Sequence, residues 1–195
     1  ADKPKDSDPR LSHARWLAMK TVIGDVSDKS VMDVGCHQGY FVIQFAKEGA
    51  FSFGIDNDRA ELMVGKSRVE LARLKGVFFS EMTITPANLP SLPTTDIVVF
   101  LSVFHHWVRA YGEEVAKTML QELMSKAREH VVFDTGMPDE VRATWASELE
   151  FMKPDGRAWM LKFFEENGFR QVVDCGEFPT TISGINRPLL VGARI

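Results

Sequence analysis

Short apolar runs alternate with stretches of helical periodicity along most of the chain. Glycine, proline or polar residues flank these runs, which is typical of strands separated by turns and helices. The predicted strands are residues 30–34, 51–55, 77–80, 96–101, 130–134, 171–175 and 189–193. The predicted helices are residues 11–23, 40–48, 59–74, 113–127, 138–151 and 157–167, with Ser12, Asp58 and Asp155 as candidate N-caps.

The predicted strands are almost continuously apolar, and helices separate most of them. Strands of this kind form parallel sheets that helices cover on both faces. No helical pattern lies between residues 175 and 189, so the last two strands are expected to pair in antiparallel fashion at the sheet edge. We therefore expect an α/β fold with a doubly wound, mostly parallel seven-stranded sheet, an antiparallel edge hairpin near the C-terminus, and helices on both faces.

Length and polarity predict a simple domain organisation. A chain of 195 residues fits one domain, and its 45% of hydrophobic residues can build one sizeable core. The polar opening, with two prolines, predicts a flexible tail over residues 1–10. Residues 11–195 are expected to form a single domain.

Composition narrows the classes of partner and compartment. The formal net charge is −4, and no run of Lys or Arg marks a phosphate-binding stripe, so a nucleic-acid partner is not expected. Two cysteines, Cys36 and Cys175, do not suggest a disulfide framework or a metal cluster. The absence of a signal-like segment and of a membrane-length apolar run predicts a cytoplasmic protein without a membrane partner.

The richest chemical signal follows the first predicted strand, which runs into Gly35 and Gly39 before a helix begins. Glycines in such a turn let the backbone approach a ligand closely, and the helix start offers free N–H groups to an anionic part of it. Asp56 closes the second predicted strand, 21 residues beyond Gly35. A carboxylate at that place can accept both hydroxyls of an adenosine ribose, so a ligand that carries adenosine is indicated.

The loop discriminates between adenosine ligands. A dinucleotide fingerprint requires G-x-G-x-x-G, whereas this loop has His37 where the second glycine would stand. Asp33 precedes the turn and would repel a pyrophosphate, but it would favour an ammonium or a sulfonium group. S-adenosylmethionine has both cationic groups, together with a carboxylate for the helix start.

The segments VMDVGCHQG and FGIDND resemble the first two signature segments of class I S-adenosylmethionine-dependent methyltransferases. Asp33, Gly35 and Gly39 match the family pattern, and His37 departs from it. DIVVFLSVFHHW, ENGF and the late hairpin extend the resemblance over most of residues 31–195. It implies a Rossmann-like fold with S-adenosylmethionine as cofactor.

By position, the resemblance implies a set of cofactor-binding residues at four strand ends. They are Asp33, Gly35, Cys36, His37, Gly39, Asp56, Asn57, Glu81, Met82 and Ser102. The glycine loop would line the methionine part, and Asp56 would hold the ribose. Asn57 would lie by the adenine, with Glu81 or Met82 on its other side, and Ser102 would face the loop across the crevice.

Two adjacent histidines follow the fourth predicted strand and are the candidate catalytic residues. Imidazole titrates near neutral pH, so either could take a proton from an acceptor. His105 is the first choice for contact with ligand or substrate and His106 the second, while at least one of them is expected to be structural. No metal is expected, because adjacent histidines do not point together and no third ligand has suitable spacing.

The same segment bears on the acceptor. Family members that methylate base amines often carry a D/N-P-P-Y/F run here, whereas this chain has LSVFHHW. The predicted function is methyl transfer to an O or N atom of a small molecule by in-line displacement, in a monomer or homodimer. Residues 138–160 would form a substrate-cover insertion.

Three alternatives stay open. They are a non-catalytic S-adenosylmethionine-binding module, an RNA methyltransferase, and a nicotinamide-dependent oxidoreductase. The loop mismatch and the lack of a Tyr-x-x-x-Lys pair argue against the last. Six aromatic residues could line a pocket or the core: Trp16, Phe104, Trp107, Tyr111, Trp145 and Trp159.

Overall fold

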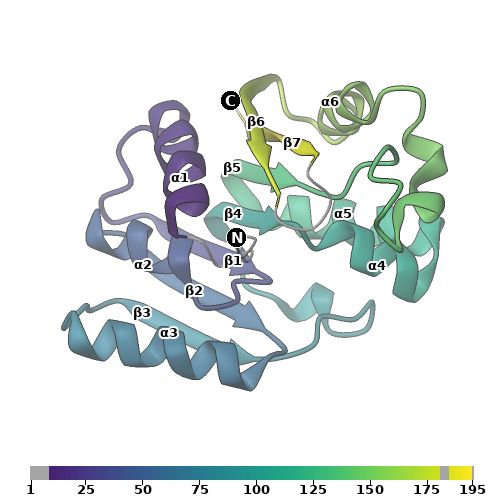
Figure 1. The fold of residues 1–195 in the computed structure, drawn as a ribbon. Helices are drawn as coiled ribbons and strands as arrows, with labels where there is room; N and C mark the ends of the chain where they lie inside the picture. The colour runs from purple at the N-terminus through teal and green to yellow at the C-terminus, as the bar shows by residue number, and fades with distance from the viewer. Residues whose placement is uncertain (1–8, 181–184, 195) are drawn as a thin grey trace.

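The computed structural model describes residues 9–180 and 185–194, which contain one seven-stranded sheet (Figure 1). Its strands are β1 (Ser30–Val34), β2 (Phe51–Asp56), β3 (Val77–Glu81), β4 (Thr95–Leu101), β5 (Ala127–Asp134), β6 (Gln171–Pro179) and β7 (Asn186–Ala193). Their order in the sheet is β3-β2-β1-β4-β5-β7-β6. β1 to β5 pair in parallel, and β7 is antiparallel to both β5 and β6. The predicted fold class is confirmed.

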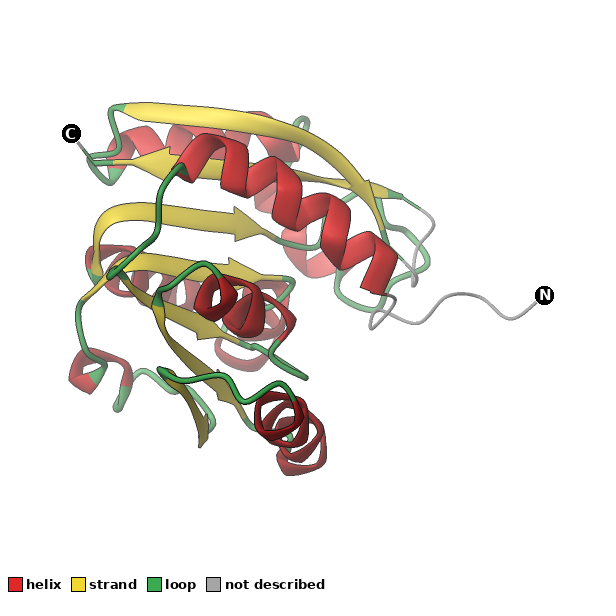
Figure 2. Ribbon diagram, turned by 90° about the vertical axis from the view of Figure 1, so that its left-hand side faces the viewer, coloured by secondary structure: helices red, strands yellow, loops and turns green. Residues whose placement is uncertain are grey.

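Helices cover both faces of this sheet (Figure 2). The α-helices are α1 (Pro9–Ile23), α2 (Tyr40–Lys47), α3 (Arg59–Leu71), α4 (Phe104–Tyr111), α5 (Glu113–Ser125) and α6 (Gly156–Glu166). Two short 3-10 helices are η1 (Leu89–Ser91) and η2 (Ala146–Met152). None of the described helices is long and apolar enough to span a bilayer.

The buried side chains of the central strands divide between two cores. In β4, Ile97 and Val99 pack in a core shared with α1 and α2, whereas Val98 and Phe100 pack in the core beneath α4, α5 and α6. Alternate residues of a strand point to opposite faces, so a strand covered on both sides must be apolar throughout. This is why the central strands are continuous apolar runs in the sequence.

The strand order places a crevice between β1 and β4. From β1 the chain moves through β2 to β3 on one side, and from β4 it moves to β5 on the other. The connections that follow β1 and β4 therefore diverge, and ligands in open α/β sheets bind at the carboxyl ends of strands at such a switch point. The glycine loop and Ser102 both lie there.

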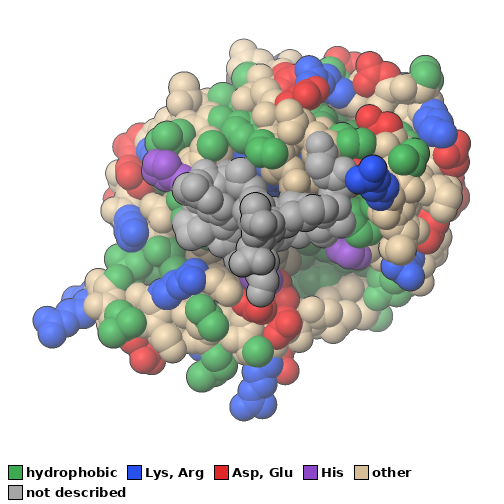
Figure 3. All heavy atoms as spheres, viewed as in Figure 1, with side chains coloured by type: hydrophobic (Ala, Val, Ile, Leu, Met, Phe, Trp, Pro, Cys, Tyr) green, Lys and Arg blue, Asp and Glu red, His purple; other side chains and the backbone are tan. Residues whose placement is uncertain are grey.

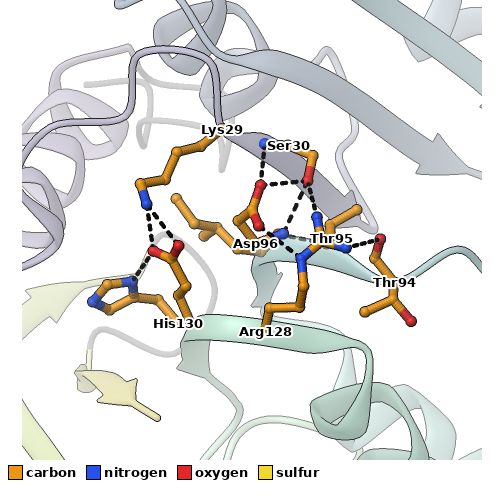
Figure 4. A network of polar contacts seen from close by, with 9 residues as sticks. Lys29, Ser30, Thr94, Thr95, Asp96, Arg128 and His130 are labelled. Atoms are coloured by element: carbon orange, nitrogen blue, oxygen red, sulfur yellow. Dashed lines mark hydrogen bonds and ion pairs between the residues drawn. The ribbon is translucent and has the colours of Figure 1, made fainter. Parts of the chain in front are cut away.

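The opposite, amino-terminal edge of the parallel strands is joined by a polar network (Figure 4). Asp96 accepts hydrogen bonds from the N–H and hydroxyl of Ser30, both at 2.7 Å, and from Arg128 Nε at 2.8 Å. These bonds hold the pKa of Asp96 well below its usual range, with Arg128 the largest cause. Lys29 pairs with Glu129 at 2.7 and 2.6 Å. The network fixes the starts of β1, β4 and β5 relative to one another.

The predicted helix at residues 138–151 is wrong. Residues 138–145 have no regular helix, and only the 3-10 helix η2 follows. Glu140 explains the difference, because its side chain is fully buried and accepts from the Met137 N–H at 2.8 Å and from the Arg187 guanidinium at 2.7 and 2.9 Å. The backbone turns around this ion pair, so the apolar periodicity of the segment does not become a helix.

Other boundaries differ by smaller amounts. Helix α1 begins at Pro9, where a proline suits the first turn, so Ser12 lies inside the helix and does not cap it. Residues 1–8 of the predicted tail lie outside the described residues. Asp58 and Asp155 are caps as predicted, accepting N–H bonds at 2.9 to 3.2 Å. Helix α4 is an addition to the predicted elements.

Candidate functional site

A cavity of about 630 Å³ opens at the carboxyl ends of β1, β2 and β4. Its lining includes most of the residues expected to contact the ligand: Asp33, Gly35, Cys36, His37, Asp56, Asn57, Met82, Ser102 and His106. Gly39, Glu81 and His105 are not part of the lining. The cavity extends past the glycine loop to α1, α4 and the β6–β7 hairpin.

The glycine loop is built from three left-handed residues. Gly35, His37 and Gly39 have φ values of 79°, 49° and 70°. A Cβ on Gly35 would lie 2.2 Å from Val103 Cγ2, so with its left-handed φ this position admits only glycine unless the Val103 side chain moves. His37 occupies a backbone region that favours glycine, which explains why the family pattern has glycine there and shows that this chain keeps the same turn.

Asp56 ties the glycine loop to the end of β2. Its Oδ2 accepts the His37 N–H at 2.7 Å, and its Oδ1 accepts the Asp58 N–H at 2.9 Å. Each carboxylate oxygen keeps further acceptor capacity for a ligand in the cavity. Asp56 therefore shapes the loop and remains available to hydroxyl donors.

Asp33 is a buried acid on the lining of the cavity. Its side chain is nearly inaccessible, and its Oδ2 has no hydrogen-bond partner among the described residues. Burial, and to a lesser degree the charge of Asp56, raises the pKa of Asp33 to about 8. A cation placed beside this carboxylate would satisfy the unpaired oxygen and stabilise its ionised form.

Cys36 is buried in the same loop and is a free thiol, as is Cys175. Burial raises the pKa of Cys36 far above its usual range, and the neighbouring Asp33 and Asp56 add to this shift. A neutral buried thiol packs as a small apolar group and is a poor nucleophile. Cys36 therefore contributes shape to the site.

Ser102 stands on the opposite wall, at the end of β4, with a φ of 59°. Its N–H and hydroxyl donate to Asp134 Oδ1 at 2.7 and 3.0 Å. Its oxygen accepts from Arg187 Nη1 at 3.1 Å. These bonds hold a non-glycine residue in a conformation that few residues adopt, as often occurs where a site must be rigid.

The two candidate histidines have different environments. His105 Nδ1 accepts the Gly136 N–H at 3.0 Å and lies 3.2 Å from Thr135 Oγ1, in the interior. Burial is the largest cause that lowers the pKa of His105 to about 2, so this imidazole is neutral. His106 lines the cavity, and burial, Arg187 and Arg109 lower its pKa. Of the two candidate histidines, His106 therefore lines the cavity, whereas His105, the first choice from sequence, does not.

Several lining residues were not singled out as site residues from the sequence. Arg15 comes from α1 and Arg187 from β7. Trp107 and Tyr111 of α4, two of the six aromatic candidates, also line the cavity, and Trp107 belongs to the core as well. Trp16, Phe104 and Trp145 are instead core residues, and Trp159 packs against that core. An arginine just before an apolar strand was the only sequence signal for Arg187. Its buried partner Glu140 lies 47 positions away.

No group of three or more His, Cys, Asp or Glu side chains in the described ranges is arranged to hold a metal ion. The charged and imidazole side chains on the described lining of the cavity are Asp33, Asp56, Arg15, Arg68, Arg187, His37 and His106.

Comparison with known proteins agrees with this geometry. A family model described as a methyltransferase domain matches residues 32–133, which is more than half of the chain. Two curated sequences of the O-antigen chain terminator bifunctional methyltransferase/kinase WbdD from Escherichia coli are each 27% identical over 164 residues. The match covers 82% of this chain but 21% of each relative, so the chain spans about a fifth of their length.

Solved structures share the fold. A 2.2 Å crystal structure of WbdD has a TM-score of 0.74 at 24% identity, over 96% of this chain and 40% of that chain. The magnesium protoporphyrin IX methyltransferase ChlM from Synechocystis PCC 6803, solved with bound SAH, has a TM-score of 0.70 at 21% identity, over 96% of this chain and 84% of that chain. With the glycine loop and the switch-point cavity, the match to the family model establishes that this chain belongs to the methyltransferase domain family, as a class I S-adenosylmethionine-dependent methyltransferase.

Proposed function

We propose that the cavity binds S-adenosylmethionine over β1, β2 and β3 and directs its methyl group to a small-molecule acceptor over β4, α4 and the β6–β7 hairpin. The observation that carries the proposal is Asp33, a buried carboxyl with an unpaired oxygen on the lining, beside a loop of three left-handed residues. Structures of ChlM with bound SAM and SAH support the same cofactor.

The residues fit the parts of this cofactor one by one. Asp33 meets the ammonium group, whose charge compensates the buried carboxylate. The start of α2 lies next to the loop and offers N–H groups to the carboxylate of the methionine part. Asp56 accepts the ribose hydroxyls. Met82, which lines the cavity, is better placed beside the adenine than Glu81, which faces Arg59 at 3.9 Å.

The bound cofactor supplies a methyl group on a positively charged sulfur, which is already a good leaving group. The contribution of the protein is to position the acceptor in line and to exclude water. Ser102 and Val103 close the wall that faces the loop, and Trp107 and Tyr111 supply an apolar surface for the acceptor. His106 is the one histidine that reaches this end of the cavity.

A small-molecule acceptor is favoured over the alternatives. The cavity extends beyond the cofactor residues, which a non-catalytic binding module would not need, and its volume is within the range of ligand pockets. On the face in Figure 3, Lys and Arg side chains are interspersed with Asp and Glu, without the single-sign stripe expected for RNA binding. Cytoplasmic location and a monomeric or homodimeric state stay predictions.

Calorimetric titration with S-adenosylhomocysteine and NAD, side by side, tests the cofactor assignment. We expect saturable binding of S-adenosylhomocysteine and none of NAD, because Asp33 disfavours a pyrophosphate. Tighter binding of NAD would end the proposal. Turnover with a panel of small acceptors then separates an enzyme from a binding module.

A further inference from the structure

The charged residues that line the cavity are divided between its two ends. Asp33 and Asp56 lie at the ends of β1 and β2, in the half assigned above to the cofactor, together with His37 of the glycine loop and Arg68 of α3. At the other end the described lining residues include no carboxylate, and the charged or titratable side chains among them are Arg15, Arg187, His106 and Tyr111. This end therefore presents guanidinium groups beside the rings of α4, with their carboxylate partners Glu140 and Asp134 outside the lining.

Arg187 is fixed in this surface from behind. Its side chain is 3% exposed, and its Nε and Nη2 donate to the two oxygens of Glu140 at 2.7 and 2.9 Å. Glu140 is fully buried and is not part of the lining, so the carboxylate supports the guanidinium without facing the cavity. Nη1 reaches Ser102 on the wall of the crevice.

The guanidinium group of Arg15 has fewer polar partners than that of Arg187. Its Nη1 lies 3.4 Å from Asp134 Oδ2, an ion pair without a hydrogen bond. Arg15 Nε is buried and has no hydrogen-bond partner among the described residues, and the same holds for Asp134 Oδ2. A buried guanidinium N–H without an acceptor is unfavourable, and an oxyanion in the cavity is the group best suited to complete it.

The same end of the cavity is poorly equipped to remove a proton. Among the described lining residues at this end His106 is the candidate base, and burial together with Arg187 and Arg109 lowers its pKa, which weakens it as a base. The hydroxyl of Tyr111 donates to the carbonyl of Ile84 at 3.4 Å. An acceptor that arrives as a neutral hydroxyl or an ammonium would need a proton removed, whereas an oxyanion would not.

We propose that the methyl acceptor is an oxyanion, a carboxylate or phosphate oxygen on an apolar group, held by Arg15 and Arg187 with its apolar part against Trp107 and Tyr111. This inference rests on the proposed function. In the step, an oxygen lone pair forms the new C–O bond to the methyl carbon while the C–S bond breaks and its electrons return to sulfur. A sulfonium and an anionic oxygen become a thioether and an ester, and no proton is released.

The first test is equilibrium binding of phenylacetate and phenyl phosphate to the complex with S-adenosylhomocysteine, followed by tryptophan fluorescence or calorimetry. Phenylacetamide and benzylamine are the neutral and cationic controls. We expect at least one anion to bind ten times more tightly than both controls. The ratio of the two anions distinguishes a carboxylate from a phosphate acceptor.

The second test uses a matched pair of variants. Arg15→Gln should weaken binding of the preferred anion about tenfold and leave binding of S-adenosylhomocysteine unchanged, and Arg15→Lys should restore part of the loss. Arg142→Gln changes an exposed arginine outside the lining and should match the parent protein. If Arg15→Gln lowers stability, the lysine variant still reports on the charge.

The outcomes separate the two proposals. If S-adenosylhomocysteine binds but neither anion exceeds its neutral and cationic controls, the oxyanion assignment is wrong and the cofactor assignment stands. Turnover that releases one proton for each methyl group transferred at pH 8 would also overturn it. Failure of S-adenosylhomocysteine to bind would overturn the proposed function itself.

Discussion

Asp33 should make cofactor binding depend strongly on pH. Its pKa is raised to about 8 by burial and by Asp56, so at pH 6 about 99% of the unliganded protein carries a protonated Asp33. Binding of a cationic amino-acid nucleoside favours the ionised form. Affinity should therefore rise about tenfold from pH 6 to pH 7 and about fiftyfold, or about 2.3 kcal/mol, from pH 6 to pH 8.

Calorimetric titration with S-adenosylhomocysteine at pH 6, 7 and 8 measures this rise. At pH 7, repeated in buffers with different ionisation enthalpies, binding should release close to one proton. Asp33→Asn should bind weakly and without this pH dependence. Equal affinity at pH 6 and pH 8, with no proton released, would refute the pairing of Asp33 with the ammonium group.

The same carboxyl has a consequence for stability in the absence of ligand. The folded state keeps the Asp33 proton up to about pH 8, whereas the unfolded chain releases it near pH 4, so stability falls as pH rises through this window. At pH 7 the free energy of unfolding should be about 4 kcal/mol lower than it is below pH 4, where Asp33 is protonated in both states. Asp33→Asn should therefore melt at a higher temperature than the parent protein at pH 7 to 8, and an unchanged or lower melting temperature would contradict the assignment.

Five further variants test other parts of the site and the sheet. Asp56→Ala should weaken S-adenosylhomocysteine binding by about 1–3 kcal/mol, and unchanged affinity in calorimetry would show the ribose assignment to be wrong. Gly35→Ala should nearly abolish cofactor binding, because its Cβ would meet the loop after β4 at 2.2 Å. His105→Ala should lower the melting temperature, whereas His106→Ala should change acceptor kinetics at nearly unchanged stability, and the reverse pattern would restore the order expected from sequence. Asp96→Asn should lower the free energy of unfolding by about 1–3 kcal/mol at pH 7. It should also weaken the dependence of stability on pH below pH 4, because the depressed pKa of Asp96 contributes stability that is lost as pH falls. Urea titrations that give the same acid profile for variant and parent protein would contradict this.

The central part of the sheet could be predicted from sequence because its strands are buried on both faces. From Ile97 onward, strand β4 alternates its side chains between two cores, so these positions are all apolar and the strand is visible as a run. The glycine loop and Asp56 could also be predicted from sequence, since their spacing along the chain reflects the turn and the end of β2. Local pattern and local geometry agree in these segments.

Long-range pairs account for what the sequence could not predict. The 138–151 segment has apolar periodicity, but the buried contact of Glu140 with Arg187 fixes it in turns. The histidine order depended on which residue of α4 faces the interior, and that helix had no cap residue to mark its start. Arg15 reaches the cavity only because α1 packs beside α2 and the β6–β7 hairpin.

A crystal structure of the protein soaked with S-adenosylhomocysteine tests the central claim most directly. The account predicts the amino group of the ligand within about 3 Å of Asp33 Oδ2, and both ribose hydroxyls on the carboxylate of Asp56. Electron density for the ligand elsewhere, or in the cavity with its amino group directed away from Asp33, would contradict it.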